Sequence, residues 1–354
     1  MKPRKTSRKR VLPINLALQG GGSHGAFTWG VLDRLLEEDW LQVESITGTS
    51  AGAMNAVLFA HGYLQDGRNG ARSALEHFWQ RVSEAARYSP IQRTPWDIMT
   101  GQWALTHSPG YLFFDLFSRL FSPYQVNPSN INPLRTILEE CVDFRQLQRA
   151  PIKLFLAATS VRTGLPRVFR NPEITVDAVL ASTCLPLMHQ AVEIDGEGYW
   201  DGGFSGNPLL TPVIRESAAQ DILLVQINPV ERPGIPRLAH EILNRINEIS
   251  FNSSLKKELR AIAMLRHMLA EEAPHAHPAW VGQWADIRLH RIFSPRLVEW
   301  GASSKLNAER AFLHMLREEG RLQAQAFLVD HTYDLGQRST FPLGSLLDTI
   351  LEQT

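Results

Sequence analysis

Three features of this 354-residue sequence predict an α/β fold, a three-layer α/β/α arrangement with a mainly parallel central sheet. Residues 14–18 and 43–47 are short apolar runs of strand length, and they begin about 30 residues apart, the usual size of a strand–helix–strand unit. Residues 26–38 lie between them and carry apolar side chains at helical spacing. A helix that connects two neighbouring strands in this way makes them parallel through a right-handed crossover.

The same alternation of helices and strands continues along the chain. Small residues dominate 51–60, which predicts a closely packed helix, and 72–87 has the pattern of a further helix. Strands are expected at 152–158, 167–170, 191–194, 222–228 and 287–292, and one or two amphipathic helices at 239–272. We also expect Ser303 or Ser304 to cap a helix that runs towards Glu319 and is stopped by Gly320.

The cysteine content and the hydropathy point to a compartment. Cys141 and Cys184 are the only cysteines, too few for a disulfide framework, so we expect a reducing, cytoplasmic environment. The apolar run 11–18 is short and interrupted by Pro13 and Asn15, so we do not expect a signal peptide. No run approaches the ~18 apolar residues that a membrane-spanning helix needs.

Charge is distributed unevenly although the formal net charge is zero. Six of the nine residues Lys2–Arg10 are basic and none is acidic, so the rest of the chain is mildly acidic. We expect residues 1–10 to be a disordered basic arm that contacts an anionic membrane surface peripherally, at the inner face, or is simply a solvated tail with weak nonspecific affinity for nucleic acid. No specific nucleic-acid partner is expected, and no feature of the sequence sets an oligomeric state.

The turn after the second strand has the form of a nucleophile elbow. Gly48 and Gly52 flank Ser50 in Gly-x-Ser-x-Gly, and small residues are needed there because the sharp strand-to-helix turn crowds both sides of the serine. Ser50 would then lie at a helix N-terminus, where the Ala51 N–H and the helix dipole favour negative charge. The alternative is a plain strand–turn–helix corner with an incidental serine.

The turn after the first strand is a candidate oxyanion loop. It comprises Gly20, Gly21, Gly22, Ser23, His24 and Gly25. The glycine spacing also fits a dinucleotide-binding fingerprint, but that motif needs an acid at the end of the second strand, and the elbow occupies this place. We therefore expect no cofactor and infer that successive glycines bring backbone amides close to a substrate oxygen. His24 would either add positive charge beside the loop or cap the turn.

A serine nucleophile needs a base, and the best candidate is Asp201. It begins Asp-Gly-Gly with Gly202 and Gly203, and an aspartate on such a turn after a strand can point across the end of a sheet. An ordinary Asp-Gly hairpin turn is the alternative. If Asp201 is the base, we expect partial burial to raise its pKa. The paired histidines His275 and His277 lack further ligands nearby, so no metal site is expected.

The ordered set Gly-Gly-Gly-x-x-Gly, Gly-Thr-Ser-Ala-Gly and Asp-Gly-Gly resembles the patatin-like phospholipase family, particularly its bacterial cytosolic branch. The likeness extends over about residues 12–230 and includes the stretches 157–160, 181–186 and 199–208. It implies a patatin-like fold and a Ser–Asp dyad without a catalytic histidine. Ser50 would be the nucleophile and Asp201 the base, with Gly20–Gly22 and the Ala51 N–H holding the oxyanion. Many family members have Arg or Lys where this chain has His24.

The resemblance also implies a domain organisation and a reaction. Residues 11–230 would form the catalytic domain, and 231–354 a mostly helical extension packed on it. Independently of the resemblance, the length and aromatic content of segment 88–133 predict a lid or acyl-binding wall, or an extension packed on the core. The reaction would be hydrolysis of lipid carboxylic esters, such as a phospholipid or lysophospholipid, through an acyl-enzyme; monoglycerides and acyl-thioesters fit as well.

Two other interpretations stay open at this point. An ordinary α/β-hydrolase with a Ser–Asp–His triad would use a histidine that follows Asp201, and the candidates are His240, His267, His275, His277, His290, His314 and His331. A catalytically silent, membrane-associated binding protein that keeps a hydrolase fold would need no working serine.

Overall fold

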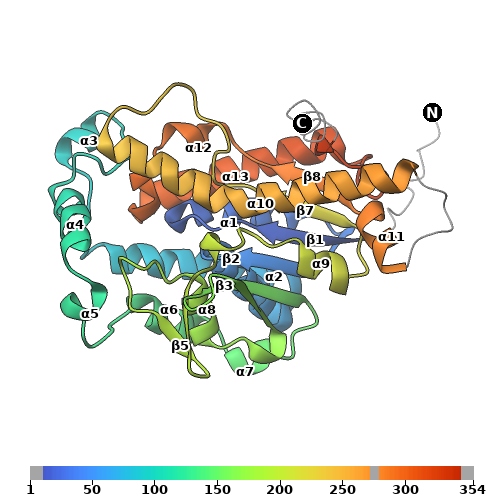
Figure 1. Cartoon of the computed structure of the whole chain (residues 1–354), viewed down its shortest axis with the longest axis horizontal. Coiled ribbons are helices and arrows are strands. Elements are labelled where there is room, and N and C mark those ends of the chain that lie inside the picture. Colours follow the sequence, from blue (N-terminus) through green and yellow to red (C-terminus); the bar gives the residue numbers. More distant parts are fainter. Residues whose placement is uncertain (1–10, 272–278, 344–354) are drawn as a thin grey trace.

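The computed structural model describes residues 11–271 and 279–343. It consists of one mixed β-sheet with helices packed on both faces (Figure 1). In the described chain the strand order is β5-β6-β3-β2-β1-β7-β8, and β4 pairs with β3 outside this path. The five strands from β3 to β8 along this order are parallel, whereas β4, β5 and β6 pair antiparallel. The predicted fold class is confirmed. The arm 1–10 lies outside the described residues, as do His275 and His277.

All strands except β6, for which no range was predicted, lie close to the predicted positions. The strands are β1 (Leu12–Leu18), β2 (Leu41–Thr49), β3 (Lys153–Ser160), β4 (Pro166–Arg170), β5 (Val192–Ile194), β6 (Glu197–Asp201), β7 (Asp221–Val225) and β8 (Arg288–Ile292). The longer helices are α1 (Gly25–Leu35), α2 (Ala51–Ala86), α4 (Pro109–Leu120), α10 (Ala239–Glu271) and α13 (Arg310–His331). The shorter helices are α3 (Pro95–Met99), α5 (Pro123–Val126), α6 (Pro133–Cys141), α7 (Phe144–Leu147), α8 (Val176–Ser182), α9 (Thr211–Glu216), α11 (Ala279–Asp286) and α12 (Arg296–Glu299).

Alternating side chains of the central strands supply a core to each face of the sheet. Leu16 and Leu18 of β1 pack with α1, α2 and α13 on one face. Ala17 points to the other face and packs with α9 and α10, which Figure 1 shows crossing in front of the sheet. Both faces of the parallel strands are therefore covered by helices, as their continuous apolar sequences require.

The predicted site segments lie together at the carboxyl ends of the parallel strands. β1 ends before Gly20, β2 ends before Ser50, and the loop after Val225 leaves the same edge because β7 runs parallel to β1. Asp201 arrives on the antiparallel strand β6, opposite Ala158 near the end of β3. Gly20 and Asn228, 208 positions apart in the sequence, thus meet at the carboxyl ends of the strands, where open α/β sheets bind ligands.

The segments 51–60 and 72–87 are two helical stretches within α2, joined at a kink where Asp66 and Gly67 have non-helical backbone angles, so the two predicted helices are confirmed. The expected cap of a later helix is wrong. Ser303 and Ser304 do not cap a long helix, since they form a 3₁₀ turn that ends at Leu306, and α13 begins at Arg310.

Gly320 does not stop α13 either, because it lies in the middle of the helix. Its Cα packs directly against the Phe27 carbonyl of α1, and a side chain there would clash. Gly320 therefore allows α1 and α13 to pack closely against each other and does not mark the end of a helix. Among the described helices, none combines the length and apolar character that crossing a bilayer requires.

Segment 88–133 carries three local helices at one end of the molecule, α3, α4 and α5 (Figure 1). None of the residues in α4 is buried. Its Phe113, Leu116 and Leu120 are 66%, 61% and 67% exposed. These residues lie on one face of the helix because they are spaced three and four residues apart. The segment therefore presents an apolar surface to solvent.

Candidate active site

Ser50 occupies a strained turn between β2 and α2. Its φ of 55° and ψ of −125° are rare for a residue with a side chain, and such strain is typical of functional turns. The turn is secured from another element, because the Ser50 N–H donates a hydrogen bond to Ser182 Oγ of α8 at 3.0 Å. Ser50 itself is partly exposed. The elbow geometry that the sequence predicts is therefore present, with Ala51 as the first residue of α2.

Asp201 is fully buried at the end of β6. Its N–H donates to the Cys184 carbonyl at 2.7 Å, and its own carbonyl accepts the Thr159 hydroxyl at 2.8 Å, so its backbone is held on both sides. One carboxylate oxygen, Oδ1, accepts the Gly203 N–H at 2.7 Å within the turn Gly202–Phe204. The other oxygen, Oδ2, is buried without a hydrogen bond of standard geometry in the described structure.

Burial raises the pKa of Asp201 to about 7, while the Gly203 N–H and the Ser50 hydroxyl lower it. No cation pairs with this carboxylate among the ion pairs of the described chain. The Ser50 hydroxyl is close enough to lower the pKa of this carboxyl group, so the structure brings these two predicted residues together. A carboxyl group with this pKa can accept a proton near neutral pH far better than an ordinary aspartate.

The loop after β1 turns into a short 3₁₀ segment, Gly22–His24, before α1 begins at Gly25. Gly20 packs against Ser50 so closely that a Cβ on it would lie 2.5 Å from Ser50 Cβ. Its N–H donates to Asn207 Oδ1 at 2.6 Å and is thus not available to a substrate. For the amides of Gly21 and Gly22 no acceptor is present in the described structure. The loop therefore offers two amide donors, not the three that its glycines suggest.

Buried amide side chains support this loop from below. Gln19 Oε1 accepts the backbone N–H groups of Ile227 and Asn228, at 3.0 and 2.9 Å. Asn228 Nδ2 donates to the Gly20 carbonyl at 2.6 Å, and Gln19 Nε2 donates to the Asn207 carbonyl at 3.1 Å. These supporting residues were not predicted from the sequence. Two signals for them were available, since Gln19 directly precedes the glycines and Asn207 follows the Asp-Gly-Gly turn.

His24 has neither of the roles expected of it. It is buried, its Nε2 lies 2.7 Å from Ser304 Oγ, and its ring contacts Trp300 and Phe312 edge-on. Burial lowers its pKa to about 3, and the positive charges of Lys305 and Arg232 add to this. The imidazole is therefore neutral and adds no charge, and its side chain caps neither adjoining helix. It links the loop to the 3₁₀ turn Ser303–Leu306 instead.

Lys305 in that turn lies against the loop, with its carbonyl oxygen packed on Gly22, and it was not among the residues predicted from the sequence. Its Nζ donates to Asn228 Oδ1 at 2.7 Å. Burial lowers the pKa of its ammonium to about 8, with Glu248 raising it and Arg232 lowering it from a distance. The residue as a whole is partly exposed. No local motif surrounds Lys305, so its place in the site could only be found from the fold.

The described histidines that follow Asp201 are engaged elsewhere. His290 lies between Asp221 Oδ1 and Thr340 Oγ1, at 3.0 and 3.1 Å, and Asp221 is at the start of β7, away from the edge that carries Ser50. His331 pairs with Asp334, and the His314 ring packs on Trp29. None of the hydrogen bonds within the described ranges joins a histidine to Ser50 or Asp201.

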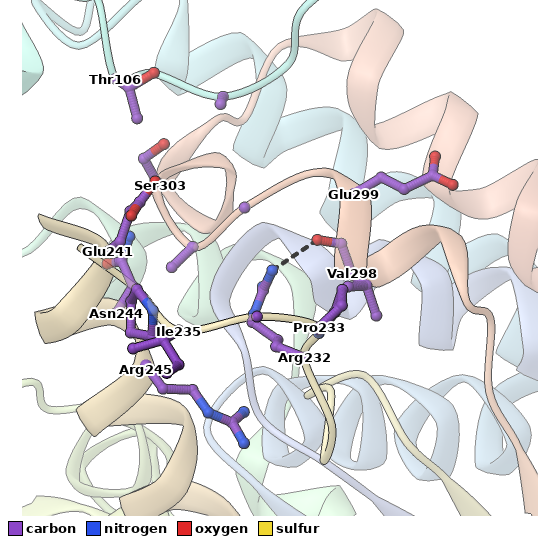
Figure 2. A pocket seen from close by; sticks show the side chains of 15 residues that line it. Thr106, Arg232, Pro233, Ile235, Glu241, Asn244, Arg245, Val298, Glu299 and Ser303 are labelled. Carbon is purple, nitrogen blue, oxygen red and sulfur yellow. Dashed lines mark hydrogen bonds between the residues drawn. The ribbon is translucent and has the colours of Figure 1, made fainter. Parts of the chain in front are cut away.

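A hollow of about 400 Å³ is lined by residues that include Ser303 of the 3₁₀ turn (Figure 2). Arg232 donates there to the Val298 carbonyl, at 2.8 Å. Arg232 and Arg245 both pair with the buried Glu248, at 2.7 and 3.3 Å. The hollow is distinct from the Ser50 site, although the turn between them connects the two. Within the described residues, no three His, Cys, Asp or Glu side chains are grouped as a metal site requires.

Comparisons with known proteins agree with the motifs. The family model described as patatin-like phospholipase matches residues 16–214, more than half of the chain. No curated protein matches the sequence significantly. Among solved structures, VipD from Legionella pneumophila is similar over 96% of this chain and 79% of its own, at 13% identity and a TM-score of 0.33, which is too weak a likeness to carry an argument. On the family match, the chain belongs to the patatin-like phospholipase family, whose members are lipid acyl hydrolases.

Proposed function

We propose that this protein is a serine acyl hydrolase that cleaves lipid carboxylic esters through a Ser50–Asp201 dyad. The observation that carries the proposal is the environment of Asp201. This buried carboxylate has no cationic partner among the described residues, a pKa near 7 and the Ser50 hydroxyl beside it. A structural aspartate at a surface turn would be solvated and would keep an ordinary pKa. Desolvation turns this aspartate into a base suited to neutral pH.

The proposed reaction proceeds by acyl transfer. Ser50 Oγ attacks the ester carbonyl carbon while Asp201 accepts the hydroxyl proton, and the C=O electron pair moves onto the carbonyl oxygen. The N–H groups of Gly21, Gly22 and Ala51 stabilise this oxyanion. Collapse of the tetrahedral intermediate expels the alcohol, which takes the proton from Asp201. Water then attacks the acyl-enzyme while giving a proton to Asp201, and collapse of this second tetrahedral intermediate releases the fatty acid as Ser50 Oγ takes the proton back from Asp201.

A lipid substrate is supported by the apolar face of α4 in segment 88–133. Phe113, Leu116 and Leu120 are exposed on this face, and the charges of Arg119 and Asp115 on the same helix pair with each other. An amphipathic helix of this kind lies favourably in the headgroup region of a bilayer. The segment would thus serve as the acyl-binding wall or lid, with the arm Lys2–Arg10 as a second, electrostatic contact with an anionic membrane.

The two other interpretations are less well supported. A Ser–Asp–His triad needs a histidine at the dyad, whereas His290 and His331 are hydrogen-bonded to Asp221 and Asp334. A silent binding protein would have no reason to keep both the strained Ser50 and the desolvated Asp201.

The test compares wild type with Ser50→Ala on phospholipid vesicles and on a soluble short-chain ester. We expect hydrolysis of both substrates to fall by about 10³-fold or more, together with loss of fluorophosphonate labelling, because the nucleophile is gone. Lipid hydrolysis that survives Ser50→Ala would contradict the proposal.

A second arm of this experiment separates the lipid surface from the chemistry. The double variant Phe113→Ser, Leu116→Ser should lower vesicle hydrolysis about tenfold and leave the soluble ester unaffected, because only the bilayer contact is weakened. Leu322→Ser on α13 is the matched control, since Leu322 is 63% exposed but lies on another element. Equal losses on both substrates would rule out a docking role for α4.

A further inference from the structure

The 3₁₀ turn Ser303–Leu306 is packed against the oxyanion loop from a distant part of the chain. Gly22 has a φ of +57°, and its Cα lies directly on the Lys305 carbonyl, where any side chain would clash. The contact is reinforced by the Ser304 hydroxyl at His24 Nε2, 2.7 Å away. Both ends of the 3₁₀ segment that follows Gly21 are therefore held by this turn, which lies outside the residues matched by the family model.

A chain of hydrogen bonds leads from the Lys305 ammonium to the loop. Lys305 Nζ donates to Asn228 Oδ1 at 2.7 Å, and Asn228 Nδ2 donates to the Gly20 carbonyl at 2.6 Å. An ammonium can only donate, so it fixes which end of the Asn228 amide faces it. The NH₂ group is thereby directed at Gly20, and the peptide that carries the Gly21 N–H is oriented by this bond.

The Lys305 charge is not neutralised by contact. In the described structure no carboxylate lies within ion-pair distance of its Nζ, and its one hydrogen-bond partner, Asn228, is neutral. The charged or titratable groups that act on it are Glu248 of α10, Arg232 in the preceding loop and His24 on the loop side. Glu248 is already bound by Arg232 and Arg245, and His24 is neutral.

We propose that Lys305 is a positioning residue of the oxyanion loop, which supplies through Asn228 the positive charge and the orientation that His24 does not supply. The inference rests on the proposed acyl hydrolase function. Charge-assisted hydrogen bonds are stronger than neutral ones, so a protonated Lys305 polarises the Asn228 amide and tightens its bond to Gly20. The Gly21 and Gly22 amides are then held ready for an oxyanion before the substrate arrives.

The role predicts an alkaline limb in the rate. Since burial lowers the pKa of Lys305 to about 8, its charge is lost above that pH, and kcat should fall there while KM changes little. Neither His24 nor Asp201 can produce this limb, because their pKa values lie near 3 and 7 and an ionised Asp201 favours the reaction. An arginine at position 305 stays protonated throughout this range.

The experiment measures kcat and KM on a soluble short-chain ester from pH 5 to 10 for wild type, Lys305→Arg and Lys305→Met. Lys305→Met should lower kcat about tenfold to hundredfold with KM changed less than about threefold, and Lys305→Arg should retain kcat within about fivefold and lose the alkaline limb. Lys153→Met is the matched control, because Lys153 pairs with Glu44 at the opposite edge of the sheet.

Three results would overturn the inference. The first is a folded Lys305→Met protein with wild-type kcat, and the second is an alkaline limb that stays in place in Lys305→Arg, which decides the matter even if Lys305→Met does not fold. The third is loss of activity in Ser50→Ala together with normal kinetics in both Lys305 variants. This result would contradict the role of Lys305 but leave the proposed hydrolase function in place. Ester hydrolysis that survives Ser50→Ala would instead remove the proposed function and this inference with it.

Discussion

The two sides of Ser50 are built in different ways. On the base side, Asp201 is positioned by neighbours within the family-matched segment, and burial raises its pKa to about 7 against the lowering effect of the Gly203 and Ser50 hydrogen bonds. On the oxyanion side, the glycine loop is held by Asn228 and by Lys305, both beyond residue 214. The base is thus held by contacts within the family-matched segment, whereas the oxyanion loop also depends on residues that follow this segment.

Both sides also carry a desolvated charge whose pKa has moved towards neutrality. The pKa of Asp201 rises to about 7 and that of Lys305 falls to about 8, in each case chiefly through burial. Between pH 7 and pH 8, Asp201 is ionised and can accept a proton while Lys305 is still protonated. Both groups therefore have the charge that the reaction requires only in this narrow pH range. A bell-shaped pH dependence of kcat with its maximum in this window follows from the comparison.

The largest effect is expected from Asp201→Asn on the base side. Loss of the general base should lower kcat by about 10²–10⁴-fold, because an amide cannot accept the Ser50 proton. The same change should alter the pH dependence of stability. The folded pKa of about 7 lies above the usual 3.8, so the stability that a protonated Asp201 contributes is present at low pH and is lost as the pH rises to about 7.

Thermal melts of wild type, Asp201→Asn and Ser50→Ala from pH 4 to 8 measure this. The Tm of Asp201→Asn relative to wild type should increase across that range, whereas Ser50→Ala should follow the pH dependence of wild type because it keeps the carboxyl group. Parallel curves for wild type and Asp201→Asn would show that Asp201 is not desolvated in the folded protein.

A smaller effect is expected from Ser182→Ala, which loosens the elbow shared by both sides. Ser182 Oγ accepts the Ser50 N–H, and without it this donor loses its partner, at a cost of about 1 kcal/mol of stability. The displaced nucleophile should lower kcat about tenfold at unchanged KM. Ser83→Ala is the control, since the hydroxyl of this buried serine in α2 donates to the Gln80 carbonyl of its own helix. An equal loss of kcat in both variants would refute a specific role for Ser182.

The sequence predicted those parts of the site that are local in the chain. The strand-to-turn junctions at Gly20 and Ser50 and the Asp-Gly-Gly turn are short motifs whose conformations follow from small residues after buried strands. Ser182 and Lys305 were missed because their contribution depends on tertiary contacts 132 and 77 positions away, with Ser50 and Asn228. Gly320 was misassigned for the same reason, since the close approach of α1 is invisible in a helical pattern.

The smallest effect on activity, yet a clear one on stability, is expected from His24→Gln on the oxyanion side. A neutral imidazole contributes no charge to the loop, so near neutral pH kcat should stay within about threefold of wild type. The folded pKa of about 3 lies below the usual 6.5, so His24 favours the folded state above pH 6.5 and its contribution is lost as the pH falls towards 3. Glutamine cannot be protonated, and the Tm of His24→Gln relative to wild type should therefore rise on acidification.

The pH trend of the His24→Gln Tm is opposite in sign to that of Asp201→Asn over an overlapping pH range. A protein that carries both substitutions should therefore show a much flatter dependence of stability on pH than either single variant. A His24→Gln protein that is as acid-sensitive as wild type, or that loses its activity at pH 7.5, would mean that the charge on the oxyanion side comes from His24 after all and not from Lys305.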